Sequence, residues 1–117
     1  MLNEFDIPIL KKSYDLYKTF NEYRKLIPKQ DRFTVFEHCE NKMLNLIEEI
    51  FRAGQTSKPR KVLILEDASI SLNLLRIFIR LLKDIKSIEP KKYIILQANI
   101  DEIGRMLGGW IRSTKSE

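Results

Sequence analysis

The chain has 117 residues, of which 44% are hydrophobic and 32% charged, and its formal net charge is +5. This length and composition are typical of one small helix-rich globular domain, residues 1–117, and leave no room for a second. A membrane-spanning segment is excluded, because the longest mainly apolar run, residues 70–82, is interrupted by Asn73, Arg76 and Arg80.

The first residues and the cysteine content indicate the cellular compartment. Acidic side chains occupy the N-terminal stretch MLNEFDIPIL, where a secretory signal peptide would carry basic ones. Cys39 is the single cysteine, so an internal disulfide is excluded. We therefore expect a cytoplasmic protein.

Positive charge is concentrated in the second half of the chain. Residues 1–57 contain nine Lys or Arg and nine Asp or Glu, whereas residues 58–117 contain twelve and seven, so the whole excess of five lies there. A basic surface attracts polyanions, which include nucleic acid, an anionic membrane surface and an acidic protein. A solvated surface with a modest basic bias is the alternative interpretation.

Apolar residues recur at helical spacing in four segments, which predict helices at about residues 9–27, 34–54, 59–87 and 90–113. The short apolar runs VLIL and YIIL are interpreted as helix, because each begins a long pattern with a helical period. The first predicted helix ends before Pro28 and carries on one face Leu16, Phe20, Tyr23 and Ile27.

The second and third predicted helices each have a complete apolar face. A capping box of Thr34 and Glu37 would start the second helix, whose apolar face is Phe36, Cys39, Met43, Leu46, Ile50 and Ala53. The third starts near Pro59 and has the apolar face Leu65, Ala68, Leu72, Leu75, Ile79 and Leu82. A second apolar stripe on the third helix requires a further partner, in the bundle or on a neighbouring subunit; it contains Ile70, Leu74, Ile77, Leu81 and Ile85.

The fourth predicted helix starts near Pro90 and is interrupted by glycines. Its apolar face is Tyr93, Leu96, Ile100, Ile103, Leu107 and Trp110, and the residues from Ser113 onwards are expected to fray. Gly104, Gly108 and Gly109 each cost about 1 kcal/mol relative to alanine in a helix interior, so a close helix contact must offset that cost. We expect the glycines and the adjacent tryptophan to contact another helix, in the same bundle or in a neighbouring subunit.

Short connections separate these four segments. Helices joined by short connections become antiparallel neighbours, which predicts an all-α fold, an up-down-up-down antiparallel four-helix bundle. The chain has no internal repeat, low-complexity segment or linker that would divide it.

The sequence lacks the residue patterns that catalysis or metal binding requires. His38 and Cys39 are adjacent, and neighbouring side chains on a helix point about 100° apart, so the two form neither a catalytic dyad nor a metal site. No CxxC, HExxH, phosphate-loop or G-x-S-x-G motif occurs. We therefore expect a protein without enzymatic activity, cofactor or metal.

Basic residues form a more informative pattern. Arg76, Arg80 and Lys83 are spaced i, i+4 and i+7, which places them on one helix face. Other basic residues crowd two helix starts or share a face of the fourth helix, namely Lys58, Arg60, Lys61, Lys91, Lys92, Arg105 and Arg112. Together they predict a nucleic-acid-binding surface that contacts phosphates, and the absence of aromatic side chains in the stripe predicts no base stacking. The alternative is a solvated face whose arginines pair with acids such as Glu66 or Asp101.

Three stretches resemble one bacterial protein family. They are GRMLGGWIRS near the C-terminus, preceded by DEI; LLRIFIRLLKDIK in the third predicted helix; and IPKQDRFTVFEHCEN, which leads into the second. Over nearly its whole length the chain resembles the four-helix-bundle family that includes the accessory variability determinant of diversity-generating retroelements. The same family includes proteins encoded in intervening sequences of large-subunit ribosomal RNA genes, and the motifs do not separate the two groups.

The resemblance implies a small basic bundle that assembles into a homopentameric barrel. Retroelement members bind the reverse transcriptase and nucleic acid, either template RNA or cDNA, and support mutagenic retrohoming without catalytic activity of their own. Arg76, Arg80 and Arg105 match arginines of the family, and lysine is common there in place of Arg112. A ring would also cover the glycine patch and the second apolar stripe at Ile70, Leu74 and Ile77. A homo-oligomeric bundle of the ribosomal intervening-sequence type, whose role is obscure, is the alternative.

Overall fold

The computed structural model describes residues 6–117; residues 1–5 of the predicted domain, which begin the acidic N-terminal stretch, lie outside the described residues. Every regular element in the described part is helical: α1 (Asp6–Tyr23), the 3-10 helix η1 (Arg24–Leu26), α2 (Lys29–Arg32), α3 (Val35–Gly54), α4 (Arg60–Asp84) and α5 (Pro90–Lys115). The all-α prediction is confirmed for this part of the chain.

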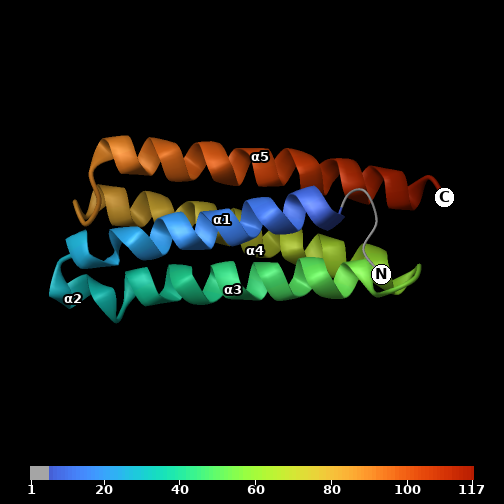
Figure 1. Ribbon diagram of the computed structural model, residues 1–117, viewed down its shortest axis with the longest axis horizontal. Coiled ribbons are helices and arrows are strands. Elements are labelled where there is room, and N and C mark those ends of the chain that lie inside the picture. Colours follow the sequence, from blue (N-terminus) through green and yellow to red (C-terminus); the bar gives the residue numbers. More distant parts are fainter. Residues whose placement is uncertain (1–5) are drawn as a thin grey trace.

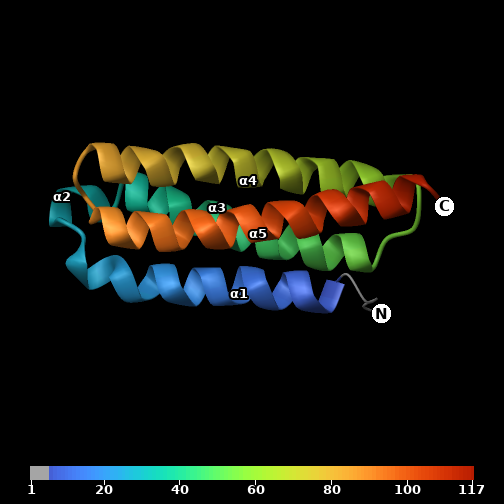
Figure 2. The same cartoon turned by 90° about the horizontal axis from the view of Figure 1, so that it is seen from above.

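The four long helices form an antiparallel bundle with extents of 46 × 22 × 19 Å. α4 packs against α3 and α5, and α1 packs against the same two helices from the opposite side (Figure 1 and Figure 2). The C-terminus and the α3–α4 connection lie at one end of the bundle, and α2 and the α4–α5 connection lie at the other (Figure 1). This is the predicted up-down-up-down arrangement.

One apolar face of each long helix forms the core. The faces predicted for α3 and α4 are completely buried, and α5 contributes Leu96, Ile100, Ile103, Leu107 and Trp110. Tyr93, predicted on the same face of α5, is only partly buried. The rings of Phe20 on α1 and Phe36 on α3 stack with their centroids 4.1 Å apart, and such a pair adds about 1 kcal/mol beyond the area that it buries.

The first helix ends earlier than the sequence predicts. α1 stops at Tyr23 and is followed by η1, and Ile27 is extended, with φ −82° and ψ 135°. Pro28 explains this difference, because proline lacks a backbone N–H and disfavours a helical conformation at the preceding residue. The guanidinium group of Arg32 donates hydrogen bonds to the carbonyl oxygens of Ile27 (2.9 Å) and Lys25 (3.2 Å). α2, which the sequence analysis did not predict, carries this arginine and so closes the turn.

The capping box predicted at the start of α3 is wrong. Thr34 has φ −121° and ψ −100°, and its side chain makes no capping hydrogen bond. Its hydroxyl group instead donates to the carbonyl oxygens of Gln30 and Asp31, each at 3.4 Å. A threonine hydroxyl can bond to backbone groups on either side of it, and α2 supplies acceptors on the preceding side.

The third predicted helix also ends early, at Asp84 rather than near residue 87. Lys86 adopts a left-handed conformation with φ 63°. The backbone N–H groups of Lys86 and Ser87 donate to the carbonyl oxygens of Lys83 (2.9 Å) and Leu82 (2.8 Å). This hydrogen-bond pattern closes a helix through one left-handed residue, so the chain can turn directly into α5.

The predicted fraying from Ser113 is wrong. α5 continues to Lys115, and Thr114 is 1% exposed. Nζ of Lys58, in the α3–α4 connection, donates to the carbonyl oxygen of Glu117 at 3.0 Å. The end of α5 is therefore held by burial and by a contact from a distant part of the chain.

Candidate nucleic-acid interface

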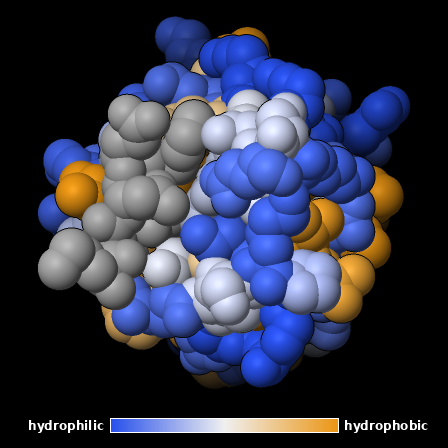
Figure 3. Space-filling view, turned by 90° about the vertical axis from the view of Figure 1, so that its right-hand side faces the viewer, coloured by the Kyte–Doolittle hydropathy of each residue, from blue (hydrophilic) through white to orange (hydrophobic). Residues whose placement is uncertain are grey.

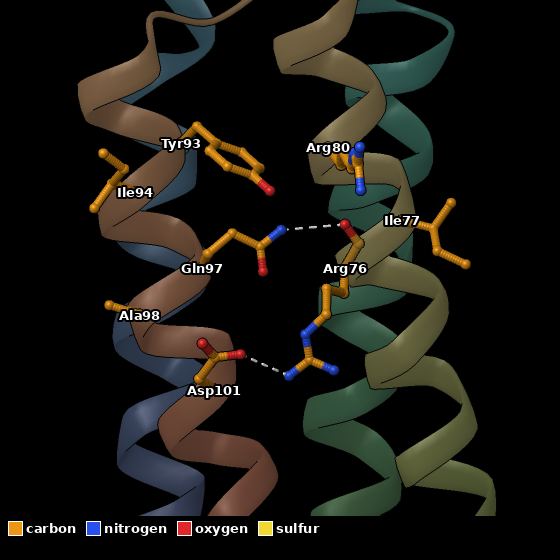
Figure 4. Close-up of a pocket in the computed structure, with 8 residues that line it drawn as sticks. All are labelled: Arg76, Ile77, Arg80, Tyr93, Ile94, Gln97, Ala98 and Asp101. Atoms are coloured by element: carbon orange, nitrogen blue, oxygen red, sulfur yellow. Dashed lines mark hydrogen bonds and ion pairs between the residues drawn. The ribbon is translucent and has the colours of Figure 1, made fainter.

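The predicted basic stripe of α4 lies beside α5. Arg76 and Arg80 line a groove between the two helices (Figure 4). Nη2 of Arg76 is 2.9 Å from Oδ1 of Asp101, and its Nη1 is 2.8 Å from Oδ1 of Asn73. The ion pair that the sequence analysis left open as an alternative is therefore present. Because the Asp101 side chain is 53% exposed, the pair contributes less than about 1 kcal/mol to folding.

Two further cations of the stripe share one acidic partner. Nε of Arg80 and Nζ of Lys83 each lie 3.7 Å from a carboxylate oxygen of Asp84. The Arg80 side chain is 70% exposed, so its guanidinium group is accessible to a ligand. Nζ of Lys83 also lies 4.6 Å from the ring centroid of Tyr93, a cation–π contact. One carboxylate thus faces two cations, and this end of the stripe stays positive.

The groove between α4 and α5 has a volume of about 580 Å³ and is lined by Arg76, Ile77, Arg80, Tyr93, Ile94, Gln97, Ala98 and Asp101. Tyr93 and Gln97 point from α5 toward α4 (Figure 4), and Nε2 of Gln97 donates to the carbonyl oxygen of Arg76 at 3.2 Å. Ile77 and Ile94 point away from the groove on opposite sides (Figure 4). The stripe on α4 itself contains no aromatic side chain, as the sequence indicates, but α5 places Tyr93 beside it.

Basic residues at the start of α4 lie beside the end of α5. Lys58 bonds to the carbonyl oxygen of Glu117, and Nζ of Lys61 is 5.9 Å from the ring centroid of Trp110. The dipole of α4 alone disfavours lysines at its N-terminal end. The C-terminal end of the antiparallel α5 lies beside them, and the carbonyl groups there favour cations. Arg60 is exposed. This end of the bundle is largely hydrophilic, with apolar side chains at its margins (Figure 3).

Arg105 and Arg112 are exposed on α5. Among the side chains that the structure describes, neither of these arginines, nor Arg60, forms an ion pair. These three arginines therefore carry positive charge that no described carboxylate neutralises at close range.

The three glycines of α5 lie in two different environments. A Cβ atom at Gly104 would be 3.5 Å from Cδ2 of Leu72 on α4. At Gly108 and Gly109, a Cβ atom would meet only the guanidinium group of Arg112, at 3.4 Å and 3.9 Å. Gly104 thus faces α4, whereas the other two leave a shallow surface that the Arg112 side chain covers.

The second apolar stripe of α4 lies on the outside of the bundle. Ile70 and Ile77 are 65% and 62% exposed, and Leu63, seven residues before Ile70, is 61% exposed. Leu74 is of intermediate exposure. Trp110 is only 1% exposed, so it packs inside the bundle and is not available to a partner.

The remaining reactive side chains do not form a catalytic group. Burial raises the pKa of the Cys39 thiol to about 12, and the neighbouring Glu40 adds to the rise, so the thiol stays protonated. The ring of His38, the residue before Cys39, lies edge-on to the ring of Phe78, with the centroids 5.0 Å apart. No cluster of metal-binding side chains occurs within residues 6–117.

Each helix in this range is too short or too polar to cross a membrane.

Comparisons with known proteins agree with this architecture. A crystal structure of a protein of unknown function from the S23 ribosomal protein family of Bacteroides thetaiotaomicron matches with a TM-score of 0.82, over 92% of this chain and 98% of that one, at 20% sequence identity. At that identity the likeness supports the fold alone. No curated protein matches the chain. The family described as bAvd-like, where bAvd is the accessory variability determinant, matches residues 7–114. The chain therefore belongs to the bAvd-like family.

Proposed function

We propose that this protein is a non-catalytic accessory protein of a diversity-generating retroelement, which binds nucleic acid and the reverse transcriptase to support mutagenic retrohoming. Membership of the bAvd-like family supports the accessory role. The observation that carries nucleic-acid binding is the accessible positive charge on α4 and α5, above all Arg80, Arg105 and Arg112. Template RNA and cDNA both present the phosphates that such cations bind.

We rank the basic residues as phosphate ligands by their exposure and by the acidic partners that they have. Arg80 is 70% exposed, and Arg105 and Arg112 have no described acidic partner, so a phosphate meets little competition there. The Arg112 guanidinium group covers Gly108 and Gly109 and is itself exposed, so a phosphate can reach it there. Arg76 is held by Asp101, so a phosphate must compete with a carboxylate for it.

Lys83, Lys58 and Lys61 already make contacts within the fold. Lys83 lies over Tyr93, Lys58 bonds to the last residue, and Lys61 lies over Trp110. We rank them with Arg76 as secondary ligands that add long-range attraction. Arg60, which is exposed and has no described ion-pair partner, ranks with the primary group.

We also propose that copies of the chain assemble into a homopentameric ring through the outer face of α4. Leu63, Ile70 and Ile77 recur every seven residues as an exposed apolar ridge. A closed ring requires two different surfaces to meet. α3 offers a second apolar strip, because Leu44 and Phe51, also seven apart, are 42% and 50% exposed. The ridge of one subunit against the strip of the next would bury both.

A second candidate function is that of a homo-oligomeric bundle encoded in a ribosomal RNA intervening sequence. The three motifs that carry the family resemblance fit this group as well, because they do not separate it from the retroelement members. The neighbouring genes separate the two: a reverse transcriptase gene and a template repeat support the retroelement function, whereas flanking ribosomal RNA supports the alternative.

The reverse-transcriptase contact is tested by co-expressing this chain with the reverse transcriptase encoded beside it. We expect the two to elute as one complex in size-exclusion chromatography after nuclease treatment. Separate elution at moderate salt would contradict the proposed partnership.

A further inference from the structure

We propose that the groove between α4 and α5 holds one unpaired nucleotide of a single-stranded nucleic acid, with its base against Tyr93 and its phosphate at Arg80 and Lys83. This inference rests on the proposed nucleic-acid binding and specifies the form of the ligand. A basic stripe alone would not distinguish single strands from duplexes, because phosphate contacts carry no information about the base.

Tyr93 supplies the surface for the base. Its ring is partly buried in the wall of the groove and points toward α4 (Figure 4). Nζ of Lys83 lies over the ring, 4.6 Å from its centroid, so a base stacks on that face once the lysine side chain moves aside to the phosphate. The accessible guanidinium group of Arg80 lines the same groove. Aromatic rings beside cations are the means by which proteins hold single strands, because every base has a face that stacks and every nucleotide carries a phosphate.

Polar groups at the other end of the groove fit the edge of a base. The side chain of Gln97 is fixed by its hydrogen bond to the carbonyl oxygen of Arg76. The carboxylate of Asp101 accepts a hydrogen bond from Arg76 and is still 53% exposed. Because this carboxylate repels phosphate, the phosphate is expected near Arg80, and the base edge is expected at Gln97, one helical turn from Tyr93.

The dimensions of the groove select an unpaired nucleotide. A volume of about 580 Å³ falls in the range of about 300–1,000 Å³ that is usual for small-ligand sites. Packed helices lie about 8–10 Å apart, so a duplex cannot enter between them, and its bases are stacked out of reach. Ile77 and Ile94 point away on both sides (Figure 4) and leave the groove open between them.

The test compares a short single-stranded RNA containing 2-aminopurine with a blunt RNA duplex, both titrated against the full chain at low salt. We expect Tyr93→Ala to weaken single-strand binding about tenfold, to abolish the quenching of 2-aminopurine and to leave duplex binding unchanged. Tyr93→Phe keeps the aromatic ring, so it should retain the single-strand affinity and the quenching of 2-aminopurine. Tyr93→Leu keeps apolar volume against the core and should lose the quenching even where the alanine variant is unstable.

The matched control is Tyr14→Ala on α1. Tyr14 is 58% exposed, and Nζ of Lys18 lies 5.5 Å from its ring centroid, so it repeats the tyrosine and lysine pair outside the groove. We expect this variant to bind both ligands as the unchanged chain does. An equal loss of single-strand binding in the Tyr14 and Tyr93 variants would overturn the assignment to the groove.

Four other outcomes would overturn the inference. Single-strand affinity that is unchanged in the Tyr93 variants, or that falls in parallel with duplex affinity, would mean that no base enters. If the Tyr93 variants change the mass measured by light scattering but not the affinity for RNA, the groove is a contact between protein chains instead. If the unchanged chain binds neither RNA at low salt, the proposed nucleic-acid function fails as well.

Discussion

Arg24, next to α3, and Arg80, on the α5 side of α4, are both arginines near a carboxylate, yet their surroundings differ. Nη1 of Arg24 is 2.8 Å from Oε1 of Glu40, whose side chain is 12% exposed. The same guanidinium group lies 5.4 Å and 5.8 Å from the ring centroids of Phe33 and Phe36. Arg80 is 3.7 Å from its partner Asp84 and is 70% exposed.

This difference separates cations that stabilise the fold from cations that are available to a ligand. The carboxylate of Glu40 beside Arg24 is largely removed from water, so the arginine is needed to compensate its charge. The exposed ion pair between Arg80 and Asp84 competes with water for its contacts, so it contributes little to the free energy of folding. Both residues look alike in the sequence, and burial and distance decide which role each one has.

The largest expected effect comes from removing the three cations of the α4 stripe. Replacing Arg76, Arg80 and Lys83 together by alanine should weaken nucleic-acid binding at low salt by at least about tenfold, and should make the slope of log affinity against log salt shallower by about 2 to 3. The fold should persist, because these side chains are at the surface. Fluorescence anisotropy at several salt concentrations measures both quantities, and unchanged binding would remove the stripe from the interface.

Replacing Arg24, the cation that stabilises the fold, should change stability and not nucleic-acid binding. Arg24→Ala should lower the free energy of unfolding by about 2 kcal/mol, because the carboxylate of Glu40 is left without its partner. Nucleic-acid affinity should not change. Urea denaturation measures the stability, with Arg80→Ala as the control, which should stay within about 0.5 kcal/mol of the unchanged chain. A stability loss of equal size in both variants would refute the distinction.

Substitutions at Gly108 and Gly109 on α5 test whether the surface beneath Arg112 affects stability and assembly. Gly109→Ala should raise the free energy of unfolding by about 0.5–1 kcal/mol, because alanine favours helix and its Cβ atom meets only the flexible end of Arg112. Gly108→Leu should instead disturb helix packing or assembly, because a leucine side chain would displace the Arg112 guanidinium group, which lies 3.4 Å from the position of a Cβ atom there. Thermal unfolding and light scattering report the two effects; a Gly108→Leu oligomer of unchanged mass and stability would mean that this patch is only surface.

The smallest effect concerns Glu49 on α3. Burial raises the pKa of its carboxyl group, and Asp67 adds to the rise, while a hydrogen bond with Ser71 opposes it. The folded state therefore holds this proton more tightly than the unfolded chain, so stability falls as pH rises from about 4 through the raised pKa. Relative to Glu49→Gln, the unchanged chain should lose stability between pH 4.5 and pH 7 in urea denaturation. Parallel pH dependences would contradict this assignment.

Helical periodicity predicted the core well, because burial in a bundle follows the same 3.6-residue repeat as the sequence pattern. The apolar face of α3 was predicted residue by residue, and on α4 only Ile64, which is 9% exposed, was missed among the buried residues. The helix ends were less predictable, since they depend on local competition for hydrogen bonds. Thr34 could have capped α3 but bonds to α2, and Lys86 takes a left-handed conformation that sequence spacing does not predict.

The candidate interface was only partly predictable, because it is built across two helices. Spacing on α4 placed Arg76 and Arg80 on one face, and the possible pairing with Asp101 was foreseen. Tyr93 was assigned to the apolar face of α5, and nothing in the spacing of one helix places its ring beside Lys83 on another. A tyrosine at the edge of an apolar face, on a helix expected to pack beside a basic helix, is the sequence feature that could have predicted this contact.

The measurement that tests the central claim most directly is a titration of the purified chain with structured RNA and duplex DNA at two salt concentrations, with the mass of the protein determined by light scattering. We expect binding that weakens steeply with salt, by a species of pentamer mass, and that is at least about tenfold weaker at low salt in the variant lacking Arg76, Arg80 and Lys83. A pentamer that binds neither nucleic acid at low salt would contradict the proposed function, although the four-helix bundle would remain.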